Sequence, residues 1–350
     1  MYIVTLINFL VIILAYIARL KKFRWCLCFS LIVACAFFSI RYNYGNDYMS
    51  YLAEFNAINT YSDIEVSDAE IGWTVLNRLF GPLGFSYLIA FLTIFQYFTL
   101  YWFIKRYVKP DFWYIIIAIY FLSASLNIVM ISALRQALAM SILILSVPSI
   151  LSRRWYFVVI FILFSSLFHK SSLILLPFVP FLGYLNAIKP RLFSVLMIAS
   201  YVGIYVMGPF VETQITSIID LYFSKYDVYL DVEDESSIGI GWVINIILFL
   251  FLNWLQEKDP NNIFLKIWIV SFLFVPLGSI IPIFARIRYY FILLGINGVL
   301  SLYVNRKVNP LSYAMCLYYF MVLVYGYFSF FSNPIYAKAY SRYITVIGGQ

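Results

Sequence analysis

Long apolar segments recur along the whole chain and constrain its fold more than any short motif. A helix needs about 20 apolar residues to cross ~30 Å of hydrocarbon, and only a helix or a closed barrel satisfies its backbone there. Twelve segments approach this length, at about 2–18, 25–41, 87–104, 112–131, 134–151, 155–168, 171–188, 192–209, 239–256, 263–283, 287–304 and 311–331. The sequence predicts an all-α polytopic membrane protein with about 12 transmembrane helices in one domain, residues 1–350.

The composition indicates that the positive net charge orients membrane helices and does not bind nucleic acid. Hydrophobic residues make up 64% of the chain and charged residues only 11%, so the formal charge of +8 lies mostly between apolar segments. Basic residues in that position orient membrane helices, and we expect no nucleic-acid partner. The first apolar segment precedes its basic cluster, the reverse of a cleavable signal peptide, so we expect it to form the first helix.

Basic clusters alternate from one connection to the next and predict the topology. They are Arg19 to Arg24, Lys105 to Lys109, Arg153 with Arg154, Lys189 with Arg191, Lys258 with Lys266, and Arg306 with Lys307. All six fall in every second connection, which the positive-inside rule assigns to the cytoplasm. Both termini and the two long connections, about 42–86 and 210–238, are then predicted outside.

The predicted outer connections have room for chemistry, whereas most inner ones are tight basic turns. The second outer loop carries an acidic run between Asp227 and Glu235, which is more typical of a solvated surface than of a cation site. No Walker motif or dinucleotide fingerprint occurs. We therefore expect neither a metal nor a cofactor.

The first polar stretch is Arg41-Tyr-Asn-Tyr-Gly45-Asn-Asp47, directly after the second apolar run. Gly45 permits a tight turn or the close approach of a ligand. Arg41 and Asp47 place one cation and one carboxylate at a membrane boundary, where an ion pair between them would order the turn. We interpret Arg41 and Gly45 as candidate substrate contacts.

Two further boundary motifs carry candidate site residues. Arg135 and Gln136 open the fifth predicted helix, where the helix dipole favours an anion, although an arginine there can equally anchor the helix end. His169 is the only histidine and lies in a very short outer turn beside Lys170. It is either an ordinary boundary residue or a proton acceptor.

Arg286 and Arg288 stand at the predicted outer start of the eleventh helix. Residues two apart diverge on a helix, so both can face one ligand only if the helix begins at about Arg288. These two arginines would then converge with Arg41, Arg135 and His169 on one outer cavity. Guanidinium groups grip a diphosphate in a bidentate manner.

The motifs in this order resemble the EpsG family of bacterial polysaccharide polymerases, relatives of the Wzy O-antigen polymerases. They are Arg41-x3-Gly45-x-Asp47-x3-Tyr51-x3-Phe55, Glu70-Ile-Gly72-Trp, Arg135-Gln136-x2-Ala139 and Phe168-His169-Lys-Ser-Ser-Leu-Ile-Leu-Leu-Pro177. The second half of the chain matches mainly by hydropathy and by Arg286-x-Arg288. The resemblance implies a GT-C-like membrane glycosyltransferase in the bacterial cytoplasmic (inner) membrane, with its active face outward (periplasmic).

The same resemblance implies the substrates and the roles of the site residues. Donor and acceptor would both be undecaprenyl diphosphate-linked glycans in the bilayer, and a chain-length regulator is a further partner that the family allows. The arginines would hold diphosphate, and Asp47 or His169 would be the general base, with Glu70 a weaker candidate. Tyr44, Tyr48, Tyr51 and Trp73 would stack on sugar rings, unless they are interface-belt residues.

Two other functions fit parts of the pattern. A lipid-linked oligosaccharide flippase would also have many spans and a cationic path, but its charges should line a mid-membrane route. A membrane O-acyltransferase would use a histidine and an arginine, yet it needs a cytoplasmic acyl donor. The only histidine of this chain is predicted outside.

The predicted topology can be tested with two reporter fusions. A reporter enzyme that is active only outside the cytoplasm should be active when fused after Ser236 and inactive when fused after Asn262. Ser236 lies in a predicted outer connection, whereas Asn262 lies in a connection that a basic cluster marks as cytoplasmic. The opposite pattern would turn the candidate residues inward and contradict an outer active face.

Overall fold

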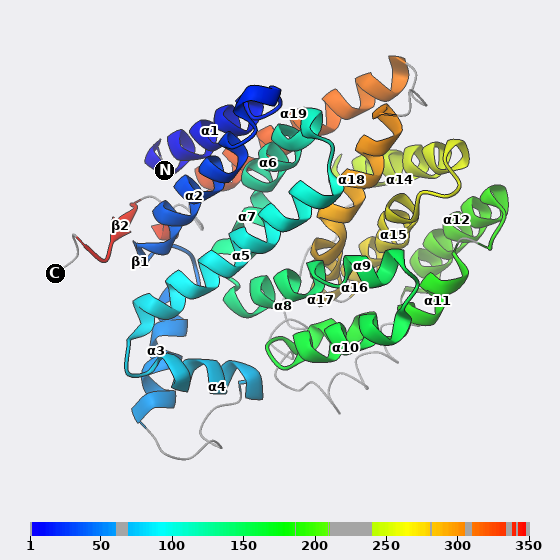
Figure 1. The fold of residues 1–350 in the computed structure, drawn as a ribbon. Helices are drawn as coiled ribbons and strands as arrows, with labels where there is room; N and C mark the ends of the chain where they lie inside the picture. The colour runs from blue at the N-terminus through cyan, green and yellow to red at the C-terminus, as the bar shows by residue number, and fades with distance from the viewer. Residues whose placement is uncertain are drawn as a thin grey trace. The chain divides into compact units, whose positions relative to one another are not determined.

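The computed structural model describes residues 2–60, 69–185, 187–208, 210, 240–280, 282–304, 310–333, 338–340 and 342–347, and most of them are helical (Figure 1). The chain divides into two compact units, Met1–Leu176 with Asn309–Gln350, and Pro177–Val308. The prediction of a single domain over residues 1–350 stays a prediction, and each unit is described by itself.

The first unit contains the N-terminal helices, the last long helix and a short sheet. Its α-helices are α1 (Tyr2–Ile17), α2 (Cys26–Ser39), α3 (Tyr48–Thr60), α4 (Ile71–Phe80), α5 (Phe85–Tyr107), α6 (Trp113–Leu122), α7 (Ala124–Ile131), α8 (Leu134–Ile144), α9 (Val147–Leu151), α10 (Trp155–Ser166) and α19 (Pro310–Ser332). Its 3-10 helices are η1 (Lys21–Phe23), η3 (Pro110–Phe112) and η4 (Lys170–Leu175), and its strands are β1 (Arg41–Tyr42) and β2 (Ile344–Thr345). Helix α5 packs against both α2 and α8, and α8 packs against α10.

The second unit is built from α11 (Phe178–Tyr184), α12 (Pro190–Val206), α14 (Ile240–Lys258), α15 (Ile263–Ser271), α16 (Phe274–Ile280), α17 (Pro282–Ile287), η6 (Arg288–Phe291) and α18 (Ile292–Val304). Helices α15 and α18 approach closely because α18 presents glycines to α15: a Cβ on Gly295 would clash with the Trp268 ring and one on Gly298 with the backbone of Leu265. Small residues at helix contacts are typical of membrane proteins.

Every one of the twelve predicted segments overlaps one or more described helices, which confirms the helical membrane-protein class. Two segments within the described ranges, Lys21–Ser39 and Phe85–Tyr107, are long and apolar enough to cross a membrane. Several others are shorter apolar helices because the chain breaks within them, for example at Ser123 between α6 and α7. The count of about 12 spans stays a prediction.

The predicted loop over 42–86 is itself largely helical. After β1 it forms α3 and α4, two helices that cover the beginning of α5 in Figure 1. The buried residues of α3 are Tyr48, Tyr51, Phe55 and Ile58, which repeat with helical spacing. The first three join a core that includes Trp73 of α4, Leu88 of α5 and Leu134 of α8. The acidic run near Glu235 in the second predicted loop lies outside the described residues.

A turn at Gly45 connects β1 to α3 and confirms the expected need for glycine. Its φ is +115°, and a Cβ there would lie 2.8 Å from the Ser132 hydroxyl. The C-terminal tail closes over this turn, since β2 pairs antiparallel with β1 and the Tyr343 ring stacks on Phe37 at 4.1 Å. The Tyr340 hydroxyl lies 2.6 Å from that of Ser132.

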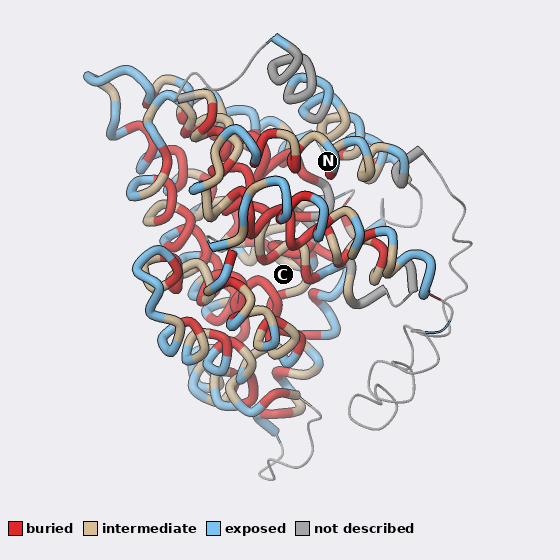
Figure 2. Tube along the Cα trace, turned by 90° about the vertical axis from the view of Figure 1, so that its right-hand side faces the viewer, coloured by how far each residue is buried: buried red, intermediate tan, exposed pale blue. Residues whose placement is uncertain are grey.

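Burial follows the helical period along most of the described helices (Figure 2). Each turn has buried positions on one side and exposed positions on the other. Some buried positions are polar: Asn8 of α1 donates to the hydroxyl of Tyr327 on α19 at 3.1 Å. In the second unit Lys266 is buried, and its Nζ donates to the carbonyl of Leu185 just beyond α11 at 2.6 Å. These contacts satisfy polar groups that apolar surroundings cannot.

Candidate active site

Three predicted site residues, Glu70, Arg135 and His169, come together in the first unit. Nη1 of Arg135 donates to Oε2 of Glu70 at 2.8 Å, and Nδ1 of His169 lies 4.0 Å from Oε1 of the same carboxylate. They come from the start of α4, the start of α8 and the turn after α10, which are neighbours in Figure 1. Glu70 is thus the residue on which the other two converge.

Each of these side chains is fixed by a helix end. Glu70 is the extended residue directly before α4, and Arg135 lies in the first turn of α8, beside the buried Gln136. The start of α8 is therefore the cationic helix end that the sequence predicts. The guanidinium of Arg135 also lies over the Tyr51 ring, 5.6 Å from its centroid, so α3 supports it from one side.

The turn that carries His169 is held by hydrogen bonds of its own backbone. The His169 N–H donates to the Ser165 carbonyl at 3.0 Å, and its carbonyl accepts from both the N–H and the hydroxyl of Ser172. The next N–H, of Lys170, donates to Oε1 of Glu70 at 3.3 Å. The backbone of this turn is therefore held beside the Glu70 carboxylate.

Gly72 allows the start of α4 to reach this turn. Its N–H donates to the carbonyl of Leu167, the residue directly after α10, at 2.8 Å. A Cβ on Gly72 would lie 2.7 Å from that carbonyl oxygen, closer than real Cβ atoms come. The first turn of one helix therefore docks on the last turn of another, which satisfies an N–H of α4 that its own helix cannot.

Glu54 of α3 is the site residue that sequence reasoning missed. The Trp73 indole N–H donates to Oε2 of Glu54 at 3.1 Å, while Oε1 lies 4.0 Å from Nη1 of Arg135. Arg135 therefore stands between two carboxylates, of which Glu54 is 23% and Glu70 only 7% exposed. Helical spacing was the available signal, since Glu54 follows the buried Tyr51 by three positions and precedes Phe55.

The surroundings of Glu70 keep its carboxylate charged. Burial acts to raise the pKa of Glu70, but the Arg135 guanidinium, backbone N–H groups of Glu70 and Lys170, and His169 in its protonated form together lower it below its usual range. A depressed carboxyl pKa stabilises the fold above the unfolded-state value, and that stabilisation is lost as the pH falls through the folded-state value. The Glu70–Arg135 pair is thus intact at neutral pH.

The aromatic residues expected to stack on sugars are buried instead. Tyr44 and Trp73 are fully covered, and Tyr48 and Tyr51 are also buried. Tyr48 packs edge-on against Phe85, and Tyr51 packs edge-on against Trp73. Of these rings, Tyr51 contacts Arg135 and Trp73 donates to Glu54, whereas Tyr44 packs against Tyr340 and Tyr343 of the C-terminal tail.

Arg41 is buried as well, away from the surface position that the sequence suggests. Its guanidinium donates to the carbonyl of Phe38 at 2.6 Å, to the Thr93 hydroxyl at 3.0 Å and to the carbonyl of Ile131 at 3.5 Å. Asp47, by contrast, is exposed in the turn before α3. Arg41 joins three segments of the first unit, and its contact with a substrate stays a prediction.

Arg286 and Arg288 belong to the second unit. Helix α17 ends at Ile287 and η6 begins at Arg288, so the chain changes helix type where the sequence required a helix to begin. Arg286 is exposed, whereas Arg288 donates to the Asn245 side chain at 3.1 Å and lies over the Phe272 ring at 4.7 Å. Their convergence with Arg135 and His169 stays a prediction.

Comparison with known proteins identifies the family. Residues 24–345, nearly the whole chain, match the model of the EpsG family. The chain belongs to the EpsG family. Members of this family are Wzy-like polymerases, so the protein is a polysaccharide polymerase-like membrane protein. No curated protein and no solved structure matches it.

The arrangement in this EpsG-family protein combines a cation with a carboxylate–imidazole pair. The Glu70 carboxylate lies 4.0 Å from Nδ1 of His169, so it acts on the imidazole through its charge, which favours the protonated ring. Arg135 beside them can stabilise negative charge that develops on an oxygen. Over the described ranges, His, Cys, Asp and Glu form no group of three or more that could hold a metal ion.

Gly72 provides a test of how far the site depends on the contact between α4 and α10. Gly72→Ala should severely reduce polymer formation by this protein, because the added methyl group would push Glu70 away from Arg135 and Lys170. Gly203→Ala in α12 is the matched control, since a Cβ there has open space. Polymer formed by membranes with equal amounts of each variant is the measurement. Equal polymer from both would contradict a site that depends on this contact.

Proposed function

We propose that this protein is a metal-independent membrane glycosyltransferase. It polymerises undecaprenyl diphosphate-linked oligosaccharide repeat units into a bacterial surface polysaccharide on the outer face of the cytoplasmic membrane. Membership of the EpsG family supports the reaction class. The basic clusters on alternate connections support the outward orientation. The single observation that carries the site is the convergence of Arg135 and His169 on Glu70.

In the proposed reaction, a hydroxyl group of the acceptor glycan attacks the anomeric carbon of the donor sugar. A glycosidic bond forms, and the bond from that carbon to the diphosphate breaks. Undecaprenyl diphosphate leaves with the bonding electrons, and the hydroxyl proton moves to Nε2 of His169. Proton transfer to a positioned base contributes about 10²–10⁴-fold in rate. The negative charge of Glu70, 4.0 Å from the ring, stabilises the protonated imidazole.

Arg135 would meet the leaving diphosphate. Its contact with Glu70 is short and buried, whereas Glu54 is more exposed and lies 4.0 Å away. An incoming phosphate can therefore take the place of Glu54 while Glu70 keeps the guanidinium oriented. Arg286 and Arg288 would supply further charge to the same donor diphosphate, as predicted from the sequence.

The remaining predicted residues take supporting roles in this proposal. Arg41, buried under the turn, holds the segment from which Asp47 projects, and Gly45 lets that turn pack on Ser132. Gln136 is buried beside Arg135 in α8. Asp47 is exposed, and it is the alternative base and an alternative contact for the acceptor.

A deletion strain distinguishes polymerisation from lipid-linked oligosaccharide export. A strain without this protein should accumulate lipid-linked single repeat units that a membrane-impermeant reagent modifies from outside intact cells. Membranes that contain the protein should then convert the extracted single repeats into longer glycans. Single repeats protected from the reagent would indicate a block in flipping and would contradict the proposal.

The pH profile identifies the base. Polymerisation should fall as the pH is lowered into the range in which imidazole protonates, because His169 then loses the free nitrogen that accepts the hydroxyl proton. His169→Ala should lose roughly 100-fold or more in rate, following the usual contribution of a general base. Asp47→Asn and Glu54→Gln should keep both turnover and the acid limb of the profile. The measurement is the initial rate with extracted single repeats from pH 4.5 to 8.5.

The opposite result would move the base to Asp47. A rate that stays constant until the acidic end of this pH range, together with an inactive Asp47→Asn protein and an active His169→Gln protein, would exclude His169 as the base. All variants must insert in membranes in equal amounts. Polymer chain length, measured on the same samples, reports whether a regulator is also affected.

A further inference from the structure

Helix α4 has one face inside the protein and one face outside it. Trp73, Thr74 and Asn77 are buried, whereas Ile71, Val75 and Leu79 are 63%, 60% and 69% exposed. The three exposed residues are four apart, so they form one stripe along the helix. An aliphatic stripe exposed to this degree needs a partner other than water.

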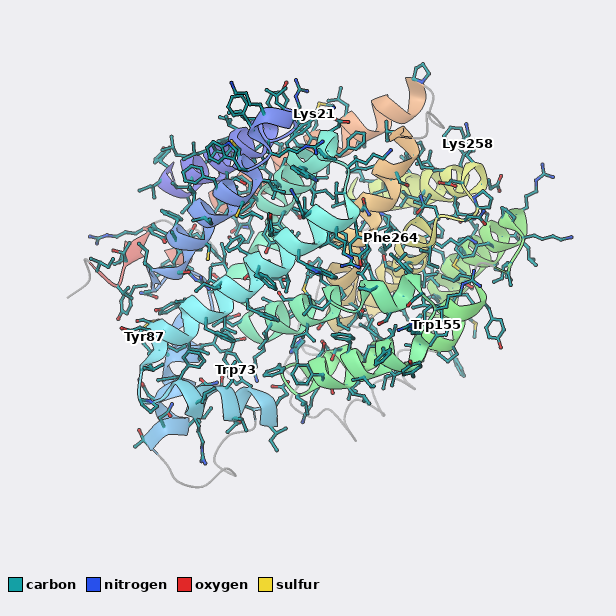
Figure 3. The ribbon with its side chains drawn as sticks, in the orientation of Figure 1. Lys21, Trp73, Tyr87, Trp155, Lys258 and Phe264 are labelled. Atoms are coloured by element: carbon teal, nitrogen blue, oxygen red, sulfur yellow. The ribbon has the colours of Figure 1, made fainter. Side chains whose placement is uncertain are left out.

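The exposed apolar surface continues from α4 into α5 without a polar interruption. From residue 71 to residue 98, every exposed residue is apolar: Ile71, Val75, Leu79, Pro82, Leu83, Tyr87, Phe91, Ile94 and Phe98. Helix α5 is one of the two segments in the described ranges that are long and apolar enough to cross a membrane. Figure 3 shows Tyr87 at the outer edge of α5. Along the chain, the stripe on α4 is therefore followed by exposed positions of α5 that are apolar enough to face lipid.

Helix α3 shows the opposite character, although it packs against α4. Its exposed positions include Ser50, Asn56, Asn59 and Thr60, with only Met49 and Ala53 apolar. This face suits water. The boundary between water and lipid therefore runs between the outer faces of α3 and α4.

Arg78 adds a second mark of a membrane surface. It follows Ile71 by seven positions and thus stands at the edge of the aliphatic stripe. A basic residue beside an apolar face is typical of helices that lie in the plane of the membrane, where its charge reaches the phosphate groups of lipids.

We propose that α4 is an interfacial helix whose stripe of Ile71, Val75 and Leu79 enters the boundary between lipid headgroups and acyl chains. The partner is the bilayer surface itself. Because Glu70 directly precedes α4, the helix holds Glu70, Arg135 and His169 at the level of the headgroups. A lipid-linked diphosphate lies at that level. Only the statement about the lipid-linked diphosphate rests on the proposed function.

Spin labels on single cysteines test the contact with lipid. The native cysteines Cys26, Cys28, Cys35 and Cys316 are replaced by serine, and one cysteine is introduced by Val75→Cys, Leu79→Cys or, as the control, Asn56→Cys. Each protein is labelled with a nitroxide in vesicles of phosphatidylethanolamine and phosphatidylglycerol. Labels at positions 75 and 79 should collide more with oxygen than with a water-soluble nickel chelate, and the label at 56 should show the reverse.

Two outcomes would overturn the inference. Strong collision with the nickel chelate at 75 and 79 would place the stripe in water. Weak collision with both reagents would mean that protein covers it, and disulfide-linked dimers of the Leu79→Cys protein would then identify a second copy as the cover. These readouts need no substrate, so they are independent of the proposed reaction.

A matched pair of charge variants tests the functional step. Val75→Asp should reduce polymer formation at least tenfold, because a carboxylate in the apolar boundary lifts α4 and moves Glu70, whereas Asn56→Asp on α3 should leave it unchanged. Normal polymer from Val75→Asp, together with lipid contact shown by the spin labels, would retain the interfacial helix and contradict its role in placing the site.

Discussion

The candidate site depends on the contacts of one carboxylate, that of Glu70. It accepts hydrogen bonds from Nη1 of Arg135 at 2.8 Å and from the N–H of Lys170 at 3.3 Å, and it lies 4.0 Å from Nδ1 of His169. Three chain segments that are far apart in sequence thus meet at one side chain. Removing one partner of a buried ion pair costs about 3–5 kcal/mol, since the other charge is left uncompensated. The pair therefore both organises the site and makes it sensitive to substitution.

A second buried cation stabilises the segment that leads into this site. Arg41 bonds the carbonyls of Phe38 and Ile131 and the hydroxyl of Thr93, which ties the end of α2 to α5 and to the end of α7. The C-terminal tail completes this region, because β2 pairs with β1. Tyr340 and Tyr343 lie near the same guanidinium. A polar segment at the end of an apolar helix is in this way enclosed by protein.

The sequence predicted the class and part of the site for physical reasons. Apolar segments of the length required by a bilayer indicated helices. The cation at a helix start indicated Arg135, and the single histidine in a short outer turn indicated His169. It could not separate a buried cation from an exposed one, so Arg41 looked like a surface residue although it is 2% exposed. Glu54 was missed because residues 42–86 were treated as a loop, and only a helical reading of 48–60 places it beside Tyr51.

The two carboxylates around Arg135 explain how one arginine can serve both the fold and a ligand. If both contacts were short, the guanidinium would be saturated and a phosphate would have to break a buried pair. The contact with Glu70 is short and buried, whereas Glu54 lies 4.0 Å away, is 23% exposed and accepts a hydrogen bond from the Trp73 indole instead. The loss of a weak, partly solvated contact costs about 1 kcal/mol or less. A charge-assisted bond to phosphate offsets that loss, so the arginine can exchange one anion for another while Glu70 keeps its orientation.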